Sequence, residues 1–368
     1  MVPLAGAGTL ILIAFVLWDA FETILLPRRV PRGFRLSRLV LRSLWVLWSA
    51  IARRIPARGW RESFLSNYAL LSLIGLLAVW AAGLVIGFAG LYWSLGSAVA
   101  STRGPVRFAT DVYMSGTTFF TLGLGDVTPA TGAARIVTVI EAGTGFAFLA
   151  LVLAYIPVLY QAFSRRESRI TMLDEWAGSP PTAAVMLRRC HEHRDPGAAL
   201  NVLLRDWEVT AAEILESHLS YPILAFFRSQ HDNQSWLAAL TAVLDVCTLV
   251  LVGVDRIDPF QARLTFAICR HTLVDVSQNV RRRPADRTPD ALEGLEELRS
   301  WLEQAGVSLV RGAEVDRKFA ELRGLYVPYV QAMSELLLMP LPGWLPGPKA
   351  RYNWETTAWA RTGRNDAH

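Results

Sequence analysis

Long apolar stretches fill much of the first 163 residues, whereas the rest of the chain mixes short apolar and polar segments. A helix that crosses a bilayer needs about 20 mostly apolar residues. Windows at residues 2–26, 69–95 and 133–163 meet this requirement, so the pattern predicts an integral membrane protein with three spanning helices. The first window lacks a basic start and a small-residue cleavage site, and we interpret it as a retained helix.

The segment that joins the first two windows is strongly basic, with ten arginines between residues 28 and 61. Cytosolic loops of membrane proteins carry an excess of arginine and lysine. We therefore expect the N-terminus outside, residues 96–130 on the external side and everything after residue 163 in the cytosol. The expected location is the inner cell membrane, which the chain crosses several times.

Residues 36–51 of this segment have the pattern of an amphipathic helix, with leucines and a tryptophan on one face and arginines and Ser49 on the other. Such a helix suits a membrane surface, and we expect anionic lipids to bind the basic segment 28–61. Arginines at every third position are also typical of a voltage sensor. A proline and a glycine within that run, and the single spanning segment upstream, make the voltage sensor the weaker interpretation.

Charge and cysteine content indicate the source of the protein and the environment of its second half. The formal net charge is +5 at pH 7, and nearly all basic residues are arginines, which is typical of a GC-rich bacterial source. The three cysteines, Cys190, Cys247 and Cys269, lie in the second half without the spacing of a disulfide framework. A reducing cytosol is the expected environment of this half.

From residue 164 onward apolar residues recur at helical spacing, with no convincing strand alternation. The predicted helices cover residues 182–193, 198–219, 223–229, 235–254, 259–280, 289–304 and 313–339. Asp258 and Thr288 each precede a proline and are expected to cap the helices that follow. We predict an all-helical cytosolic domain over residues 165–340 and an irregular tail over residues 341–368.

The stretch 236–254 is long and apolar enough to cross a membrane, but it carries Asp245 near its middle. An uncompensated carboxylate at the bilayer centre costs about 2.5–3.5 kcal/mol. We therefore interpret this stretch as a buried helix of the soluble bundle, with a fourth spanning helix as the alternative.

A short polar stretch, TTFFTLGLGDVTP at residues 117–129, separates the second and third apolar windows. Non-helical backbone lies at membrane depth only where protein buries it or water lines it. We predict a short helix over residues 109–120 that enters from outside, and an extended return from Thr121 to Gly125. Gly123 and Gly125 permit torsions that let successive carbonyl oxygens point the same way, where they replace the hydration shell of a monovalent cation.

The Thr121 hydroxyl adds an oxygen at the inner end of this stretch, and the carbonyl end of the short helix favours a cation. One chain supplies a single loop, whereas a closed ring of carbonyls needs several. We therefore predict a cyclic homotetramer. An external turn between two helices is the alternative, but the run of hydroxyl residues and the length of the preceding helix argue against it.

These residues resemble the pore signature of the potassium channel superfamily, Thr-Val-Gly-Tyr-Gly-Asp. The signature stands here as Thr121-Leu122-Gly123-Leu124-Gly125-Asp126, with matching flanks at Tyr113, Ser115, Thr118 and Pro129. The resemblance covers residues 69–163 and implies that K⁺, the permeant ion, binds at Thr121, Leu122, Gly123 and Leu124. No cofactor is expected. The implied fold is an all-α membrane protein with a pore-loop module. Its predicted domains are a transmembrane helix (1–27), an interfacial helix (28–66), the pore domain (67–164), and the cytosolic domain and tail given above.

The sequence departs from the signature within the filter itself. Leu122 is bulkier than the usual valine, and Leu124 replaces a tyrosine whose hydroxyl, in the family, ties the filter to the pore helix. We expect Leu124 to pack against Tyr113 and Met114 instead. Phe120 stands where a threonine is usual. A weakly selective monovalent cation channel is therefore the alternative to a potassium-selective one.

The resemblance also assigns supporting and gating residues. Those expected to support the filter are Tyr113, Thr117, Thr118, Asp126 and Glu141, the last by bracing hydroxyls of the pore helix. By the family's spacing, Phe146, Leu149, Leu153 and Pro157 face the conduction path, and Gly143 and Gly145 lie where the inner helix bends. Packing or lipid contact is the alternative for each gating residue.

Asp19 and Glu22 share a face near the inner end of the first window. Carboxylates inside a membrane are functional candidates by default. We nevertheless expect structural ion pairs with Arg28, Arg29 and the basic helix, because these arginines lie close in the sequence.

Domains that follow an inner helix generally control opening, so we expect the cytosolic half to gate the pore in response to a ligand that the sequence does not identify. Cys190, His191 and His193 lie close together, but their spacing is poor for zinc. The segment 218–236 is rich in aromatic and histidine residues, which favours core or subunit contacts over a ligand pocket. The sequence contains no combination of a nucleophile and a general base that indicates an enzyme. No nucleic-acid partner is expected. A membrane-anchored signalling protein with a vestigial pore is the alternative from another class.

Overall fold

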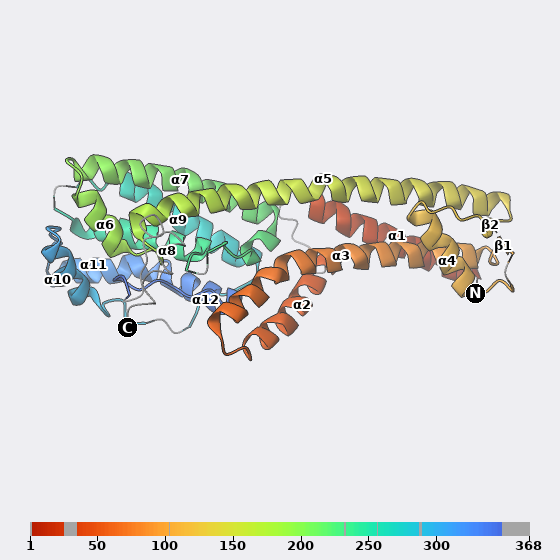
Figure 1. The fold of residues 1–368 in the computed structure, drawn as a ribbon, viewed down its shortest axis with the longest axis horizontal. Helices are drawn as coiled ribbons and strands as arrows, with labels where there is room; N and C mark the ends of the chain where they lie inside the picture. Colours follow the sequence, from red (N-terminus) through yellow and green to blue (C-terminus); the bar gives the residue numbers. More distant parts are fainter. Residues whose placement is uncertain are drawn as a thin grey trace, which may run out of the picture. The chain divides into compact units, whose positions relative to one another are not determined.

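The computed structural model describes residues 2–25, 35–102, 104–231, 233–255, 257–286 and 289–347, which are mostly helical (Figure 1). The chain divides into two compact units, Met1–Tyr160 and Gln161–His368. The first contains α1 (Val2–Ile24), α2 (Leu36–Ala52), α3 (Arg58–Ser94), β1 (Val99–Ser101), α4 (Phe108–Phe119), β2 (Val127–Pro129) and most of α5 (Gly132–Ala177). The second contains the end of α5, then α6 (Ala183–His191), α7 (Pro196–Ser220), η1 (Pro222–Phe226), α8 (Trp236–Gly253), α9 (Phe260–Asn279), α10 (Leu295–Gln304), α11 (Ala313–Gly324) and α12 (Val327–Leu337).

Helices α1, α3 and α5 correspond to the three predicted spanning windows. Their apolar windows are only 33%, 39% and 11% buried within the chain, so most of this apolar surface faces outward. α8 is also long and apolar enough to cross a membrane, but 83% of its window is buried. α8 is therefore a core helix of the second unit. The chain is an all-α membrane protein apart from the short β1–β2 pair.

α1 packs against a row of glycines on α3. A Cβ atom added at Gly83, Gly87 or Gly90 would lie 3.1, 2.6 or 2.3 Å from Val16, Ile13 or Thr9, respectively. Small residues let helix backbones approach closely in a membrane, where packing rather than the hydrophobic effect drives association. The glycine row therefore lets α1 pack closely against α3.

The two carboxylates of α1 are buried and bonded. Asp19 accepts hydrogen bonds from Trp80 Nε1 in α3 (2.9 Å) and from the backbone N–H of Ser37 in α2 (2.9 Å). Because Ser37 lies in the first turn of α2, Asp19 satisfies one of the free amides at that helix end. Glu22 lies 3.6 Å from Arg35 Nε. These contacts join α1, α2 and α3.

The other expected partners of Asp19 and Glu22, Arg28 and Arg29, lie outside the described residues. The contact between Glu22 and Arg35 confirms that the basic segment supplies an ion pair to α1. Among the described residues, Asp19 accepts hydrogen bonds from Trp80 and Ser37.

α2 turns apolar side chains outward. Leu39, Val46 and Leu47 are 51%, 62% and 62% exposed, whereas Ser49, expected on the polar face, is buried. Ser49 is satisfied locally, because its hydroxyl donates to the Val46 carbonyl (3.2 Å). Arg42 is exposed as well. An outward face that combines leucines with arginine is typical of a helix in contact with lipid.

The second unit has a continuous core centred on α8, against which α6, α9, α11 and α12 pack. Asp245 lies within this core and is only 7% exposed. The Tyr326 hydroxyl donates a hydrogen bond to Asp245 Oδ1, and Arg323 Nε lies 3.9 Å from the same oxygen. A buried carboxylate is tolerated when it is paired in this way.

The prediction of one helix over residues 313–339 is wrong, because the structure has two, α11 and α12. Pro328 lies in the first turn of α12, where its missing N–H is harmless, but within a continuous helix it would remove a hydrogen bond and clash with the preceding turn. The proline therefore separates the two helices.

Two further helix starts differ from the prediction. α10 begins at Leu295 rather than Pro289, after Gly294 with a left-handed φ of +75°; Thr288 lies outside the described residues. The predicted helix 223–229 is the short 3-10 helix η1. The expected cap at Asp258 is also one residue off, because Pro259 is the N-cap of α9 and no side chain caps the helix there. The Asp258 carboxylate lies just before it and accepts a hydrogen bond from Phe260 N (3.0 Å).

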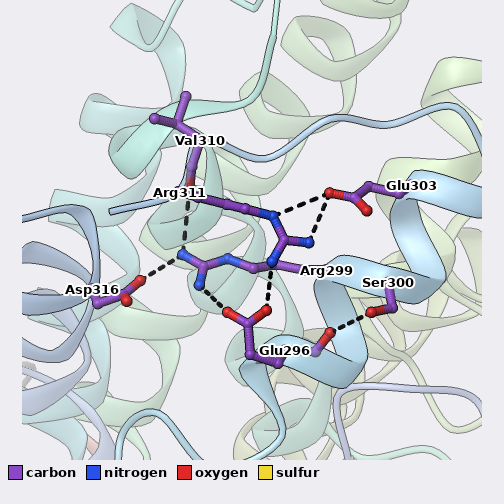
Figure 2. Close-up of polar contacts among 7 residues, drawn as sticks. All are labelled: Glu296, Arg299, Ser300, Glu303, Val310, Arg311 and Asp316. Atoms are coloured by element: carbon purple, nitrogen blue, oxygen red, sulfur yellow. Dashed lines mark hydrogen bonds and ion pairs between the residues drawn. The ribbon is translucent and has the colours of Figure 1, made fainter. Parts of the chain in front are cut away.

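An ion-pair lattice joins α10 to the loop before α11 and to α11 itself (Figure 2). Arg299, whose side chain is 4% exposed, bonds Glu296 and lies 2.6 Å from Asp316. Arg311 lies 2.6 Å from Glu296 and 2.8 Å from Glu303. Glu296 thus bridges both arginines, and its pKa is lowered by the hydrogen bonds from Arg299 and Arg311. The lattice fixes α10 and α11 to each other.

Candidate ion-conduction site

The candidate site is the segment between α3 and α5. Residues 121–125, predicted above as the ion-binding residues, are called the filter stretch. β1 precedes α4 and β2 follows the filter stretch. The two strands pair antiparallel, with Ala100 opposite Thr128. This pair was not predicted, because each strand has only three residues. The strand pair joins the two ends of the segment that contains α4 and the filter stretch. α4, Phe108–Phe119, confirms the short helix predicted over residues 109–120.

The filter stretch has left-handed backbone at every second residue. Thr121, Gly123 and Gly125 have φ of 57°, 56° and 77°, whereas Leu122 and Leu124 are not in this region. The two glycines adopt it without steric cost. Thr121 is a β-branched residue in a region that such residues rarely occupy. We did not predict this torsion at Thr121, and its strain indicates that the surrounding contacts hold the stretch in place.

The amides of the stretch point back at the end of α4. Leu122 N and Gly123 N donate to the Thr117 carbonyl (2.8 and 3.4 Å), and Thr121 N donates to the Thr118 carbonyl (3.0 Å). In a trans peptide the N–H and the preceding C=O point in opposite directions. The carbonyl oxygens of Thr121 and Leu122 therefore both point away from α4. This shared orientation is what a row of cation ligands requires.

The side chains of the stretch are uncovered in a single chain. Leu122 and Leu124 are 62% and 63% exposed, and Phe120 is 59% exposed. Leu124 was expected to pack on Tyr113 and Met114, but most of its side chain is uncovered in one chain. Met114 is instead buried in a small cluster beneath β1 and β2.

Tyr113 bonds the residue that follows the filter. Its hydroxyl donates to the Asp126 carboxylate, 3.2 Å from Oδ1 and 3.1 Å from Oδ2. Leucine at position 124 cannot tie the filter to α4, and the Tyr113 hydroxyl supplies a tie two residues further along, at Asp126. Sequence reasoning named both residues as filter support but not their bond.

Glu141 on α5 is fully buried and bonded to two other helices. Ser115 Oγ of α4 donates to its Oε1, and the Tyr92 hydroxyl of α3 donates to its Oε2 (2.8 Å). The same hydroxyl lies 3.0 Å from Thr138 Oγ1. The expectation that Glu141 braces a hydroxyl of the pore helix is confirmed, and Tyr92 is an unforeseen member of this cluster.

The two glycines of α5 differ in their surroundings. A Cβ atom added at Gly145 would lie 2.0 Å from the Phe119 carbonyl, whereas one at Gly143 has nothing within 4 Å. Gly145 therefore lets α5 touch the last turn of α4, immediately before the filter. The ring of Phe119 also lies 5.8 Å from the ring of Phe148. Both glycines were predicted as hinge residues, and only Gly145 makes a close backbone contact.

The predicted lining residues are exposed in one chain. Phe146, Leu149 and Leu153 are 69%, 55% and 64% exposed. Pro157 lies within α5, which is helical from Gly132 to Ala177. Exposure is compatible with a conduction path, with a neighbouring subunit and with lipid, so their gating roles stay predictions.

The possible metal cluster of the second unit is not formed. Among the residues that the structure describes, no group of three His, Cys, Asp or Glu side chains is placed to hold a metal ion. Burial raises the pKa of the Cys190 thiol to about 12, which keeps it protonated. His193 is exposed, and its imidazole contacts the backbone of Asp195. The segment 218–236 contributes His218 and Trp236 to the core rather than to a pocket.

Comparison with known proteins supports an ion-channel pore. Residues 75–161 match the family model described as ion channel, and this match covers most of α3, all of α4, the filter stretch and the first part of α5. A curated relative, an uncharacterized membrane protein YdjJ of Bacillus subtilis (strain 168), is 23% identical over 216 residues, or 58% of this chain and 61% of the relative. The match therefore spans less than two thirds of that relative's length. No solved structure matches the chain.

Proposed function

We propose that the protein is a homotetrameric cation channel, selective for K⁺, whose filter consists of Thr121, Leu122, Gly123, Leu124 and Gly125. The observation that carries this proposal is the orientation of the filter backbone. Two successive amides bond one carbonyl of α4, and the carbonyl oxygens of Thr121 and Leu122 point the opposite way. Carbonyl oxygens in a row can replace the water around a dehydrated alkali ion.

Assembly from several copies follows from what one chain lacks. A single filter stretch lines one side of a path, and its leucines are left in the open. Exposed apolar side chains beside a strained backbone favour cover by a neighbouring subunit. Four copies around one axis would place four sets of carbonyls around the ion and bury these leucines.

Cation preference is supported by the end of α4. The helix ends at Phe119, so the partial negative charge of its last carbonyls lies beside the filter. The Thr117 carbonyl is already occupied by the filter amides. The helix thus holds the filter by hydrogen bonds, and its carbonyl end favours a cation electrostatically.

Two sets of contacts support the filter. Tyr113 holds Asp126 at its outer end, and Glu141 joins α3, α4 and α5 behind it. In this proposal the apolar side chains of Leu153 and Pro157 close the inner path by excluding water, and the second unit governs that closure in response to a ligand. No catalytic step is assigned to any residue.

The proposed orientation places the N-terminus outside and the second unit in the cytosol of an inner membrane. The outward leucines and the arginine of α2 support contact with anionic lipid.

A weakly selective monovalent cation channel is the second candidate. The observation that favours it is the exposure of Leu124 at the position where a tied tyrosine would restrain the filter. Purified protein in a planar bilayer with K⁺ on one side and Na⁺ on the other separates the two, because strong K⁺ selectivity displaces the reversal potential far from zero.

The same recording tests conduction itself. Gly123→Ala forces a Cβ atom onto a residue with φ of 56°, and we expect the current to be lost. Gly8→Ala is the matched control, since Gly8 lies on α1 and an added Cβ there meets nothing within 4 Å. A wild-type protein that assembles but carries no ion flux would support the vestigial-pore alternative and contradict the proposal.

A further inference from the structure

Arg166 is a buried cation in the part of α5 that belongs to the second unit. Its side chain is 2% exposed, although arginine is almost never fully buried unless it is paired. Nε and Nη2 both donate to Glu167 Oε1, at 3.1 and 3.0 Å. Nη1 donates to the Leu224 carbonyl and Nη2 to the Phe227 carbonyl, each at 2.8 Å. The fifth contact joins Nη1 to His218 Nε2 at 3.2 Å.

These contacts use the whole guanidinium group. Arginine has five N–H donors and no acceptor, and each donor has a partner here. The partners lie on α5, on η1 with the residue that follows it, and on α7. Arg166 therefore fixes the part of α5 that belongs to the second unit to the segment 218–227.

The contact with His218 determines which nitrogen of the imidazole carries the proton. Because arginine only donates, His218 Nε2 must accept with its lone pair. The proton of the neutral ring is then on Nδ1, which lies 2.9 Å from the Ile214 carbonyl, a pure acceptor. Both ring nitrogens are thus committed, and a second proton on Nε2 has no acceptor to meet.

The surroundings of His218 offer little to offset an added charge. α5 presents Arg166 and, through it, Glu167, which already bonds Arg166. α8 presents the Trp236 ring, 5.2 Å away, and the Asn279 amide of α9 donates to the His218 backbone carbonyl. η1 contributes backbone carbonyls that Arg166 occupies, and the neighbouring Ser217 hydroxyl of α7 lies 3.2 Å from Nδ1.

We propose that the contact between Arg166 and His218 is a proton-operated latch, which holds the segment 218–227 on α5 while His218 is neutral and releases it when His218 is protonated. Protonation removes the acceptor of one Arg166 hydrogen bond and puts two cations in contact inside a core. Release exposes His218 to water, where the imidazolium is stable. The consequence for gating rests on the proposed function, because α5 is the helix that would line the conduction path.

Thermodynamic linkage sets the size of the effect. Burial, together with the charge of Arg166, holds the pKa of His218 well below its usual range in the latched state. In the released state we expect the ordinary histidine value of about 6.5. Acid therefore favours release, and the ratio of released to latched protein rises about tenfold between pH 7.5 and pH 5.5.

Hydrogen exchange of the full chain in detergent tests the latch without requiring ion flux. Exchange rates are divided by the intrinsic rate at each pH. For wild type we expect the protection of residues 218–227 to fall about tenfold between pH 7.5 and pH 5.5, starting below about pH 6.5. The first half of α7 serves as the internal reference and keeps its protection.

His218→Gln is the matched variant, because its amide oxygen can accept from Arg166 and its NH₂ can donate to Ile214 while it cannot titrate. We expect it to keep its protection at pH 5.5. His271→Gln removes an exposed histidine of α9, 3.8 Å from Asp275, and we expect it to respond like wild type. If His218→Gln fails to fold, the wild-type profile and its internal reference still decide the question.

The outcomes separate the latch from the channel. Equal loss of protection in wild type and His218→Gln, or no loss in wild type, overturns the latch. Bilayer recordings at cytosolic pH 7.5 and 5.5 form the second arm, in which we expect a change in open probability for wild type and none for His218→Gln. If hydrogen exchange depends on pH as predicted but no ionic current is recorded, the latch is supported and the proposed function is overturned.

Discussion

The filter stretch and the core of the second unit differ in how much of each structure one chain supplies. Leu122 and Leu124 are 62% and 63% exposed, and the amides of Leu122 and Gly123 bond the Thr117 carbonyl of α4. In the second unit, Trp236 and Leu240 of α8 are fully buried, and Asp245 finds its partners within the same chain.

This difference indicates two kinds of folding unit. The second unit has a continuous buried core that one chain forms. The first unit presents its filter and most of α5 outward. We infer that the first unit is completed by neighbours and by lipid, whereas the second is completed by itself. The four experiments below test each side of this contrast, in decreasing order of expected effect.

The largest effect concerns the cysteines of the second unit. Burial raises the pKa of Cys190 to about 12, compared with about 8.5–9 for a free thiol, so the thiolate fraction at pH 8 is about a thousandfold lower. We expect the native protein in detergent to react with iodoacetamide at Cys190 about a thousandfold more slowly than the denatured protein. Rapid labelling of the folded chain would contradict a closed core.

The next effect concerns the contact between α5 and α4. Gly145→Ala would place a Cβ atom 2.0 Å from the Phe119 carbonyl, and overpacking of this kind costs about 1–3 kcal/mol. We expect conduction in liposome flux assays to fall about tenfold or more. Gly143→Ala, which meets nothing within 4 Å, is the control for a glycine replaced on the same helix. Equal fluxes in the two variants would show that the close contact has no role.

Tyr326→Phe tests the second unit from within. The substitution removes the hydrogen bond to Asp245 and leaves a buried carboxylate with a weaker partner, which we expect to cost about 1–3 kcal/mol of unfolding free energy. Thermal unfolding in detergent measures the loss. Reversal potentials of the variant should equal those of wild type, because the filter is untouched, and a shifted reversal potential would argue that the units are not independent.

The smallest effect concerns the ion-pair lattice of α10 and α11. Arg299 is buried there, whereas Arg311 is about half exposed. Arg299→Gln leaves Asp316 without its buried partner, so we expect a clear drop in melting temperature, while Arg311→Gln should remain close to wild type because exposed ion pairs contribute little. Similar melting temperatures for both variants would mean that burial does not decide the strength of this lattice.

Features that depend on local composition could be predicted from the sequence. Apolar length identified α1, α3 and α5, and the spacing of Gly123 and Gly125 identified the filter stretch before any geometry was known. Asp245 excluded α8 as a simple membrane helix, and the structure shows the reason, since a distant tyrosine and arginine compensate the charge.

Features that depend on contacts between distant residues could not be predicted. Tyr92 joins Glu141 across 49 positions, and Arg166 meets His218 across 52. Gly145 was expected to bend a helix, and its close approach to the Phe119 carbonyl is a contact that no helical period reveals. The left-handed torsion at Thr121 could not be predicted, because threonine rarely adopts that region of backbone torsions. The break at Pro328, by contrast, was available in the sequence, because a proline inside a helical pattern marks a boundary.

The most direct test of the central claim is a density map of the purified protein in K⁺ that resolves the filter. The account predicts four chains around one axis, with the carbonyl oxygens of Thr121 and Leu122 facing that axis and ion density between successive rings. A monomer, or an assembly whose axis lies away from these oxygens, would contradict it.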